Sequence, residues 1–390
     1  MKSICAVEGV YAAGIKEGKF GLALIKAKGT AAAVFTKNLF AASPVVLMKE
    51  RMEQGFLDGI IINSGNANVY TGERGISDAK RMAEIAAEAF STTPDRIGVA
   101  STGVIGRFLH IDVIEDQCRR ISKDLLRDEK SEENAAKAIM TTDIFPKSAI
   151  SVHPGFTVAG IAKGSGMIAP NMGTMLAFIY TDAEISKEEL KRSLSVAAER
   201  SFNRVVVDGD TSTNDCAFLT ATGVRGKVSY TEFCSALEDV CISLAKQIAE
   251  DGEGATKFIE VKVDNAASEE DAALIAKTVV GSPLVKTAVY GEDPNWGRLI
   301  AAAGRAGVDF DPGLVTVSIS DGKESVVLAK KGEILADDKM HPDALAKAKS
   351  LMHGKKVFVL IDLDAGDYSA TAWGCDLTEK YVEINGKYTT

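Results

Sequence analysis

The chain has 390 residues, of which 46% are hydrophobic, 25% charged and 6% aromatic, a composition typical of globular proteins that bury a core without disulfides or metals. With 45 basic and 54 acidic residues, the formal net charge is −9, which argues against nucleic acid and anionic membranes as partners. Because no apolar run approaches the ~20 residues of a membrane span and the N-terminus opens no signal peptide, we expect a cytoplasmic protein.

Strand-like apolar runs alternate irregularly with helical patterns along the whole chain. The predicted strands are Ile60–Asn63, Phe156–Ala162, Met175–Tyr180, Arg204–Val207, Phe258–Val263, Val315–Ile319, Val357–Leu363 and Tyr381–Ile384. The predicted helices are Asp78–Phe90, Glu132–Met140, a helix that begins at Ser186 with a Ser186/Glu189 capping box, and Thr231–Ala249. Since strands and helices do not alternate strictly, a layered α/β fold with mixed sheets fits better than a doubly wound parallel sheet.

Several common catalytic and metal motifs are absent. The six cysteines form no CxxC pair and the four histidines form no HExxH motif, which excludes a zinc ribbon, a thioredoxin motif and a zincin site. The acidic run 208–215 suggests a calcium loop, but Thr213 and Leu219 stand where an EF-hand requires glycine and glutamate. We therefore predict a hydrogen-bonded turn loop near the active site, with neither metal nor cofactor.

The densest motif region is Lys163–Asp182. Its Gly164-x-Gly166-x-x-Ala169 pattern superficially matches a dinucleotide fingerprint. That fingerprint needs a helix whose N-terminus holds the pyrophosphate, whereas Pro170 and a strand-like run follow here. A nucleotide-binding regulatory protein therefore remains only an alternative hypothesis.

A second interpretation of this region starts from Gly173 and Thr174. If the bond between them broke, the α-amine of Thr174, with a pKa of ~7.7–8, could act as the base for its own hydroxyl. Glycine at position 173 would allow the strained backbone that an N→O acyl shift requires. From these residues alone, a plain turn before a core strand is the simpler interpretation.

The segment KGSGMIAPNMGTMLAFIYTDA resembles the self-cleaving segment of the ornithine acetyltransferase (glutamate N-acetyltransferase) family of arginine biosynthesis. The resemblance continues in family order through AAGIKEGKFGLALI, INSGNANVYTG, ASTGVIG, TTDIFPK, SFNRVVVDGDTSTND, GEGATKFIEV, YGEDPNWGRLIAAAGRAG and YVEINGKYTT. One departure is Gly173, where the family usually has alanine.

This resemblance implies a role for each matching residue. Thr174 would be the nucleophile, released by scission of the bond after Gly173, and Thr102 and Gly103 would form the oxyanion hole. The implied substrate-binding residues are Thr142 (or its neighbour Thr141), Lys163, Thr174, Glu253, Asn385 and Thr390.

The resemblance also implies a four-layer αββα sandwich similar to N-terminal-nucleophile hydrolases. Fragments 1–173 and 174–390 would stay intertwined as one folded unit and pair into (αβ)2 assemblies. The expected activity moves an acetyl group from N2-acetyl-L-ornithine to L-glutamate by ping-pong exchange, giving L-ornithine and N-acetyl-L-glutamate. The sequence leaves acetyl-CoA open as a second donor, and a self-cleaving amidase or aminopeptidase as the alternative enzyme.

Overall fold

The structure is a computed structural model that describes residues 3–169 and 175–387. The predicted cleavage site at Gly173 and Thr174 therefore lies outside the described residues. So does Thr390, a predicted substrate-binding residue. The chain divides into two compact units. The first comprises the described residues of Met1–Asn203 and Asp210–Ile248, and the second comprises Arg204–Gly209 and the described residues of Ala249–Thr389.

The first unit is built on a mixed sheet, in which the described strands follow the order β4-β3-β2-β9-β7-β6-β5 and β1 pairs with β2. Its strands are β1 (Tyr11–Glu17), β2 (Phe20–Phe35), β3 (Phe56–Asn66), β4 (Ile97–Val104), β5 (Lys147–His153), β6 (Phe156–Lys163), β7 (Leu176–Thr181) and β9 (Cys216–Ala221). The pairs β3–β4 and β7–β9 are parallel and the others are antiparallel. The sheet thus draws strands from both sides of the Gly173–Thr174 bond.

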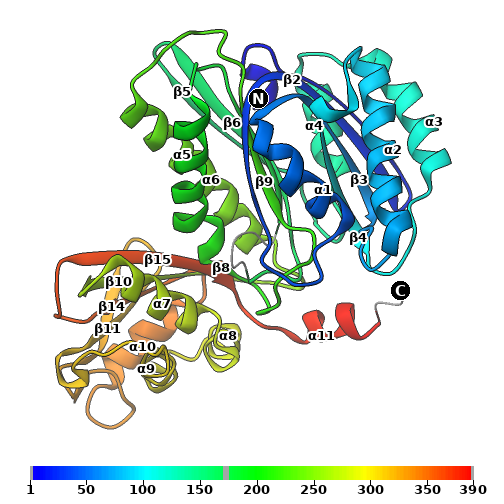
Figure 1. Cartoon of the computed structure of the whole chain (residues 1–390). Coiled ribbons are helices and arrows are strands. Elements are labelled where there is room, and N and C mark those ends of the chain that lie inside the picture. The colour runs from blue at the N-terminus through cyan, green and yellow to red at the C-terminus, as the bar shows by residue number, and fades with distance from the viewer. Residues whose placement is uncertain (1–2, 170–174, 388–390) are drawn as a thin grey trace. The chain divides into compact units, whose positions relative to one another are not determined.

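Helices cover both faces of this sheet (Figure 1). They are α1 (Ser43–Arg51), α2 (Gly72–Phe90), α3 (Ile111–Ile121), α4 (Glu129–Ala138), α5 (Lys187–Arg200) and α6 (Tyr230–Glu250), the last of which runs on into the second unit. Figure 1 shows α1, α2 and α3 on one side of the strands and α5 and α6 on the other. Close packing depends on Gly59 of β3, where a Cβ atom would lie 2.4 Å from the Phe90 ring of α2.

Local signals explain two elements that matter for the site. Helix α5 begins where its capping box predicted, because the Ser186 side chain accepts from the Glu189 N–H and the Glu189 side chain accepts in return. Strand β7 is buried at all six positions. It lies between β6 and β9, so its continuous apolar run is what a strand covered on both faces requires.

The second unit has its own mixed sheet, with the described strands in the order β13-β12-β11-β14-β10-β15-β8. Its strands are β8 (Val205–Val206), β10 (Phe258–Ala266), β11 (Thr316–Ser320), β12 (Ser325–Lys330), β13 (Glu333–Ile334), β14 (Lys356–Asp362) and β15 (Tyr368–Cys375). Its helices are α7 (Glu269–Val280), α8 (Pro283–Tyr290), α9 (Trp296–Gly304), α10 (Pro342–Leu351) and α11 (Glu379–Gly386).

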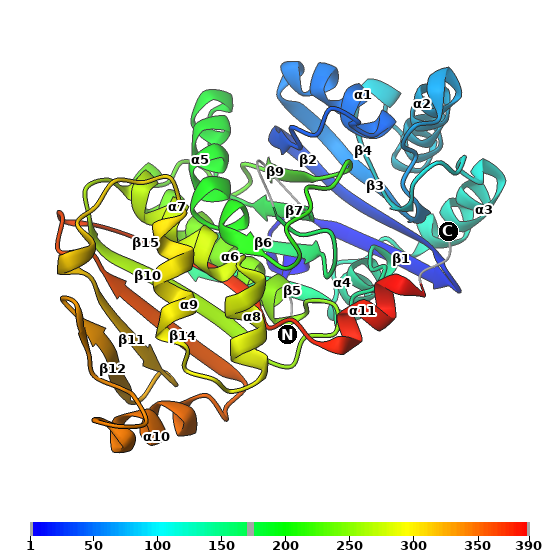
Figure 2. The same cartoon turned by 90° about the horizontal axis from the view of Figure 1, so that it is seen from below.

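The second core forms between this sheet and its helices. Along β10, the buried Ile259, Val261 and Val263 alternate with more exposed polar residues, which is the period of a strand covered on one face. Helices α7, α8 and α9 lie along that sheet (Figure 2). Short 3₁₀ helices complete the chain at Ile4–Ala6, Met52–Gln54, Pro94–Arg96, Ser122–Asp124, Phe202–Arg204 and Pro312–Leu314.

The predicted α/β class with mixed sheets is confirmed, and two predicted strands need correction. Arg204–Val207 shortens to Val205–Val206, since Arg204 closes a 3₁₀ helix. The predicted strand Tyr381–Ile384 is wrong because these residues lie inside helix α11, whose N-cap Thr378 accepts from the Lys380 N–H. Over residues 3–169 and 175–387, no single helix has the length and hydropathy of a membrane span, although the bent pair α7–α8 passes on length and composition together.

Candidate active site

Thr102 and Gly103 lie at the end of the edge strand β4 of the first unit. Thr102 is buried, and its hydroxyl forms no hydrogen bond with another described residue. Gly103 has φ +131°, and a Cβ atom there would come within 2.3 Å of the Gly65 backbone. Only glycine fits this combination of left-handed backbone and close approach. The strand end thus presents a buried hydroxyl next to a backbone that β3 holds in place.

Lys16 of β1 reaches this strand end from the side. In the parallel β3–β4 ladder Ser64 is the partner of Thr102. The Lys16 Nζ donates to the Ser64 Oγ at 2.7 Å and to the Met140 carbonyl at 2.6 Å. Burial lowers the pKa of Lys16, with Asp143 opposing this effect and Lys163 adding to it. Lys16 therefore feels the charges of the loop that holds the next group of predicted residues.

Asp143 is the centre of that loop. Its carboxylate accepts from the Lys147 Nζ at 2.7 Å, from the Gly164 N–H at 2.7 Å and from the Thr141 N–H at 3.0 Å. The Asp143 and Lys147 side chains are both 0% exposed. Burial works to raise the pKa of Asp143, but Lys147 and Lys163 together hold it below its ordinary value. Asp143 is thus a buried anion at neutral pH.

Lys163 ends strand β6, opposite Leu176 at the start of β7. Burial lowers the pKa of its ammonium, the Lys147 charge adds to that lowering, and Asp143 and Asp215 oppose it. Among the residues that the structure describes, the Lys163 Nζ has no hydrogen-bond partner. A half-buried ammonium of this kind can bind a carboxylate.

We call these residues the charged cluster: Lys16, Asp143, Lys147, Lys163 and Asp215. Three are cations and two are anions, so one positive charge is left over within the group. A site with this balance suits a substrate that carries a carboxylate.

The charged cluster is tied to Thr102 by a second route besides Lys16. Asn214, the neighbour of Asp215, donates through its Nδ2 to the Ser101 carbonyl at 2.8 Å and to the Ala67 carbonyl at 2.7 Å. Because Ser101 precedes Thr102 and Asp215 acts on the charge of Lys163, the adjacent Asn214 and Asp215 connect the predicted oxyanion pair with the charged cluster. Thr142, next to Asp143, is exposed at the surface of the same loop.

The predicted turn loop 208–215 is hydrogen-bonded as expected. The Asn214 N–H donates to the Ser212 Oγ, and the Thr36 hydroxyl donates to the Ser212 carbonyl. The Thr211 hydroxyl donates to the Ala169 carbonyl at 2.8 Å. The loop therefore lies against the end of segment 163–169.

The second unit brings two further predicted residues together. The Asn385 Nδ2 of α11 donates to the Glu253 Oε2 at 2.8 Å, although 132 positions separate them in the chain. Asn385 is exposed and Glu253 is partly buried. A carboxylate and an amide side by side can bind an ammonium and a carboxylate of an amino acid.

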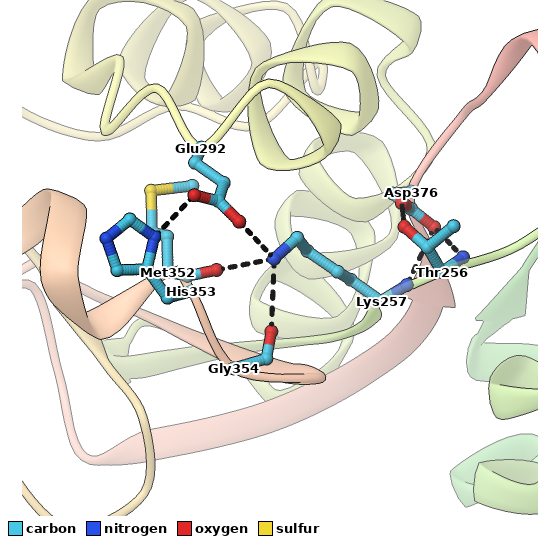
Figure 3. A network of polar contacts seen from close by, with 7 residues as sticks. All are labelled: Thr256, Lys257, Glu292, Met352, His353, Gly354 and Asp376. Carbon is cyan, nitrogen blue, oxygen red and sulfur yellow. Dashed lines mark hydrogen bonds and ion pairs between the residues drawn. The ribbon is translucent and has the colours of Figure 1, made fainter.

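A buried carboxylate, Asp376, holds the segment that follows Glu253 by hydrogen bonds to Thr256 and Lys257 (Figure 3). It accepts from the Thr256 and Lys257 N–H groups at 2.8 and 3.0 Å and from the Thr256 hydroxyl. The Thr378 hydroxyl also donates to the Gly254 carbonyl at 2.7 Å. The chain that leads into α11 is thereby fastened to the loop that carries Glu253.

Figure 3 also shows that the Lys257 side chain bonds to groups from two further segments of the second unit. Its Nζ donates to Glu292 at 2.9 Å and to the Met352 and Gly354 carbonyls at 2.7 and 3.2 Å. His353 contacts the other oxygen of Glu292. This network is a structural tie because the Lys257 ammonium and both Glu292 carboxylate oxygens are already paired.

Two alternative sites carry less chemistry. A nucleotide site would need a helix opening at Gly164, and residues 164–169 form none. The second unit also has a pocket of about 510 Å³ between α9 and the sheet, lined by Trp296, Ile300, Phe310, Val317 and Glu333 among others. This pocket is almost wholly apolar and contains none of the predicted site residues.

Sequence reasoning missed four members of the charged cluster: Lys16, Asp143, Lys147 and Asp215. All lie within motifs that carried the family resemblance, AAGIKEGKFGLALI, TTDIFPK and SFNRVVVDGDTSTND. A charged side chain is normally solvated, so the burial of Asp143, Lys147 and Asp215 could not be predicted from the sequence. Lys16 is exposed, and only its contacts with Ser64 and Met140 distinguish it.

Comparison with known proteins gives an end-to-end match. A model of the family described as ArgJ matches residues 7–390. A glutamate N-acetyltransferase of Methanosarcina mazei is 49% identical over 394 residues, covering 99% of this chain and 98% of its own. An arginine biosynthesis bifunctional protein ArgJ of Archaeoglobus fulgidus is 46% identical over 390 residues, covering 99% and 100%. Among solved structures, an ArgJ protein of Bacillus halodurans is 40% identical with a TM-score of 0.49, covering 53% of this chain and 96% of its own.

Proposed function

This chain belongs to the ArgJ family, and from that premise we propose that it is a glutamate N-acetyltransferase that moves acetyl from N2-acetyl-L-ornithine to L-glutamate. The observation that carries the proposal is the end-to-end match to curated relatives of that activity. A metal-free acyl transfer needs a nucleophile, a base, an oxyanion hole and binding groups for two amino acids. The chain offers a candidate for each.

The donor half-reaction begins at Thr174. Its hydroxyl oxygen attacks the acetyl carbonyl of acetylornithine while its α-amine takes the hydroxyl proton. The amide C–N bond then breaks, the proton passes to the leaving nitrogen, and ornithine departs from an acetyl ester on Thr174. This assignment rests on the family resemblance, because Thr174 lies outside the described residues.

Thr102 and Gly103 are the proposed oxyanion hole. A buried hydroxyl without a hydrogen-bond partner among the described residues and a neighbouring backbone N–H are donors of the right kind for the developing oxyanion. The close packing of Gly103 against Gly65 supports this role, since a rigid donor costs no reorganisation during the reaction.

The acceptor half-reaction uses the same site. The glutamate amine attacks the ester carbonyl, and the C–O bond to Thr174 breaks. The proton that the amine loses passes to the α-amine of Thr174 and from there to the departing Thr174 oxygen. Both donor and acceptor carry an α-carboxylate, for which Lys163 is the proposed partner and Thr142 a proposed hydrogen-bonding neighbour. Glu253, Asn385 and Thr390 are the proposed contacts to the remaining polar groups.

Self-cleavage between Gly173 and Thr174 is part of the same proposal. Fragments 1–173 and 174–390 would stay associated, because the sheet of the first unit pairs β6 with β7 and β2 with β9 across that bond. The (αβ)2 assembly that the resemblance implies, and the cytoplasmic location that the sequence pattern led us to expect, both stay predictions.

One assay tests the function. Purified protein is incubated with acetylornithine in buffer, once with glutamate and once without it. Ornithine release is measured in both, and the incubation without glutamate is followed for long times to detect hydrolysis. The proposal expects release that depends on glutamate, with parallel double-reciprocal lines. Release at equal rates without glutamate would instead identify an amidase. A separate arm with acetyl-CoA and glutamate tests the second donor.

A further inference from the structure

The loop that carries Thr142 and the end of the strand that carries Lys163 are both bonded to one carboxylate, that of Asp143. The Asp143 carboxylate accepts the N–H of Thr141 at 3.0 Å and the N–H of Gly164 at 2.7 Å. Thr141 and Asp143 flank Thr142, and Gly164 follows Lys163 in the chain. The Asp143 carboxylate therefore fixes the backbone next to Thr142 and next to Lys163, the two residues proposed to bind the substrate carboxylate.

The same carboxylate also controls the local charge. Asp143 is 0% exposed and paired at 2.7 Å with Lys147, whose side chain is likewise 0% exposed. The groups that face Lys163 are Asp143 on its loop, Lys147 on β5, Asp215 and Cys216 at the start of β9, and Lys16 on β1. Burial raises the pKa of Cys216, so its thiol is neutral. Asp143 and Asp215 counter the burial that favours a neutral Lys163, whereas the Lys147 charge adds to it.

We propose that Asp143 is a positioning residue for acetyl transfer, which holds Thr142 and Lys163 in place and keeps the Lys163 ammonium charged for a substrate carboxylate. This inference rests on the proposed function and deepens it. Asp143 itself is directed at Lys147 and two backbone N–H groups, so its action on the substrate is indirect.

The pH dependence of the reaction distinguishes this role from a merely structural one. Lys163 must be protonated to bind a carboxylate, so kcat/KM falls as pH rises through its pKa. Asp143 raises that pKa. In Asp143→Asn the alkaline fall therefore moves to lower pH, and KM for acetylornithine and glutamate rises by about 10- to 100-fold. The rise at acid pH, which belongs to the amines, stays where it is.

Three further variants make the test decisive. Asp116→Asn removes an exposed carboxylate paired with Arg119 and Arg120 in the same unit, and is expected to match the wild type. Asp143→Glu keeps the charge but shifts it, so the alkaline fall should stay in place while KM rises. Asp143→Asn combined with Lys147→Met also removes the buried ammonium that faced the lost carboxylate, so it should recover folding without recovering KM. Because the Lys147 charge lowers the pKa of Lys163, the alkaline fall of the double variant should lie above that of the single variant.

Each outcome decides the proposal. Wild-type KM and an unmoved alkaline limb in a folded Asp143→Asn, or wild-type KM in the double variant, would overturn it. If neither variant folds by circular dichroism, a Glu variant with wild-type KM would overturn it instead. Wild-type protein without transferase activity would refute the proposed function rather than Asp143, and calorimetric binding of ornithine to each variant would then test the positioning role alone.

Discussion

The two units both carry predicted substrate residues, and both hold them with a buried aspartate that accepts backbone N–H groups. In the first unit Asp143 accepts from Thr141 and Gly164 and is paired with the buried Lys147. In the second unit Asp376 accepts from Thr256 and Lys257, and the pair that it supports is a hydrogen bond near the surface. A buried aspartate that accepts backbone N–H groups therefore sets the local charge in the first unit, whereas in the second unit it only holds the backbone in place.

The difference follows from burial. Inside the first unit the loss of one charge strongly shifts the pKa values of neighbouring groups, because the local dielectric is low. At the exposed Glu253–Asn385 contact water screens the charge, and the contribution is that of one hydrogen bond. Changes to the charged cluster of the first unit should therefore affect pH dependence as well as KM, and changes in the second unit should affect KM and stability without moving the pH profile.

The largest expected effect is that of Thr174→Ala. Without the hydroxyl neither the acyl shift nor the acetyl ester can form, so denaturing electrophoresis should show one intact band and activity should fall on the order of 10³-fold or more. The wild type should give two bands, the larger fragment beginning Thr-Met-Leu-Ala. Efficient scission of the alanine variant would remove Thr174 from the mechanism.

Next in size is Thr102→Val, which keeps the shape of the side chain and deletes its donor. The expected loss is about 10²- to 10³-fold in kcat with KM nearly unchanged, since the hydroxyl acts on the transition state. The matched control is Thr157→Val on β6 of the same unit, for which steady-state kinetics should equal the wild type. A Thr102→Val enzyme within twofold of wild-type kcat would place the oxyanion hole elsewhere.

A moderate effect is expected from the end of the chain. Deletion of residues 385–390 should leave folding and the 173/174 scission intact but reduce acetyl transfer sharply, because the Asn385 amide that contacts Glu253 is lost. Asn385→Ala alone should raise KM for one substrate by roughly 10- to 150-fold, which corresponds to the ~1.5–3 kcal/mol of a hydrogen bond to a charged group. Lys387→Ala, at the end of the same helix, is the control. Full activity of the truncated enzyme would show that this pair is not at the substrate.

The smallest effect on catalysis is expected from Asp376→Asn. Losing the charge weakens three hydrogen bonds that tie the Glu253 loop to α11, so we expect a loss of about 1–3 kcal/mol in the free energy of unfolding and a rise in KM of only a few-fold. Urea titration measures the stability. The exposed pair Lys331–Asp364 gives the control, since Asp364→Asn should cost less than about 1 kcal/mol. A displaced pH–rate profile in Asp376→Asn would contradict the contrast between the units.

Much of the fold was predictable because its signals are local. Apolar runs of strand length gave β3, β6, β7, β10, β11 and β14, and the Ser186/Glu189 capping box marked the start of α5. Tyr381–Ile384 shows the limit of such signals: four residues can fit either period, and the structure makes them helical behind the cap at Thr378.

By itself the sequence determined the α/β class, the acidic surface, the absence of familiar metal and histidine motifs, and, through resemblance, the candidate nucleophile and its partners. Only the tertiary structure decided that Lys16 meets the Met140 carbonyl 124 residues away and that Asn385 meets Glu253. It also decided that Asp143 and Lys147 are fully buried. The physical reason is that periodicity and caps act over a few residues, whereas burial of a charge depends on which distant strands pack around it.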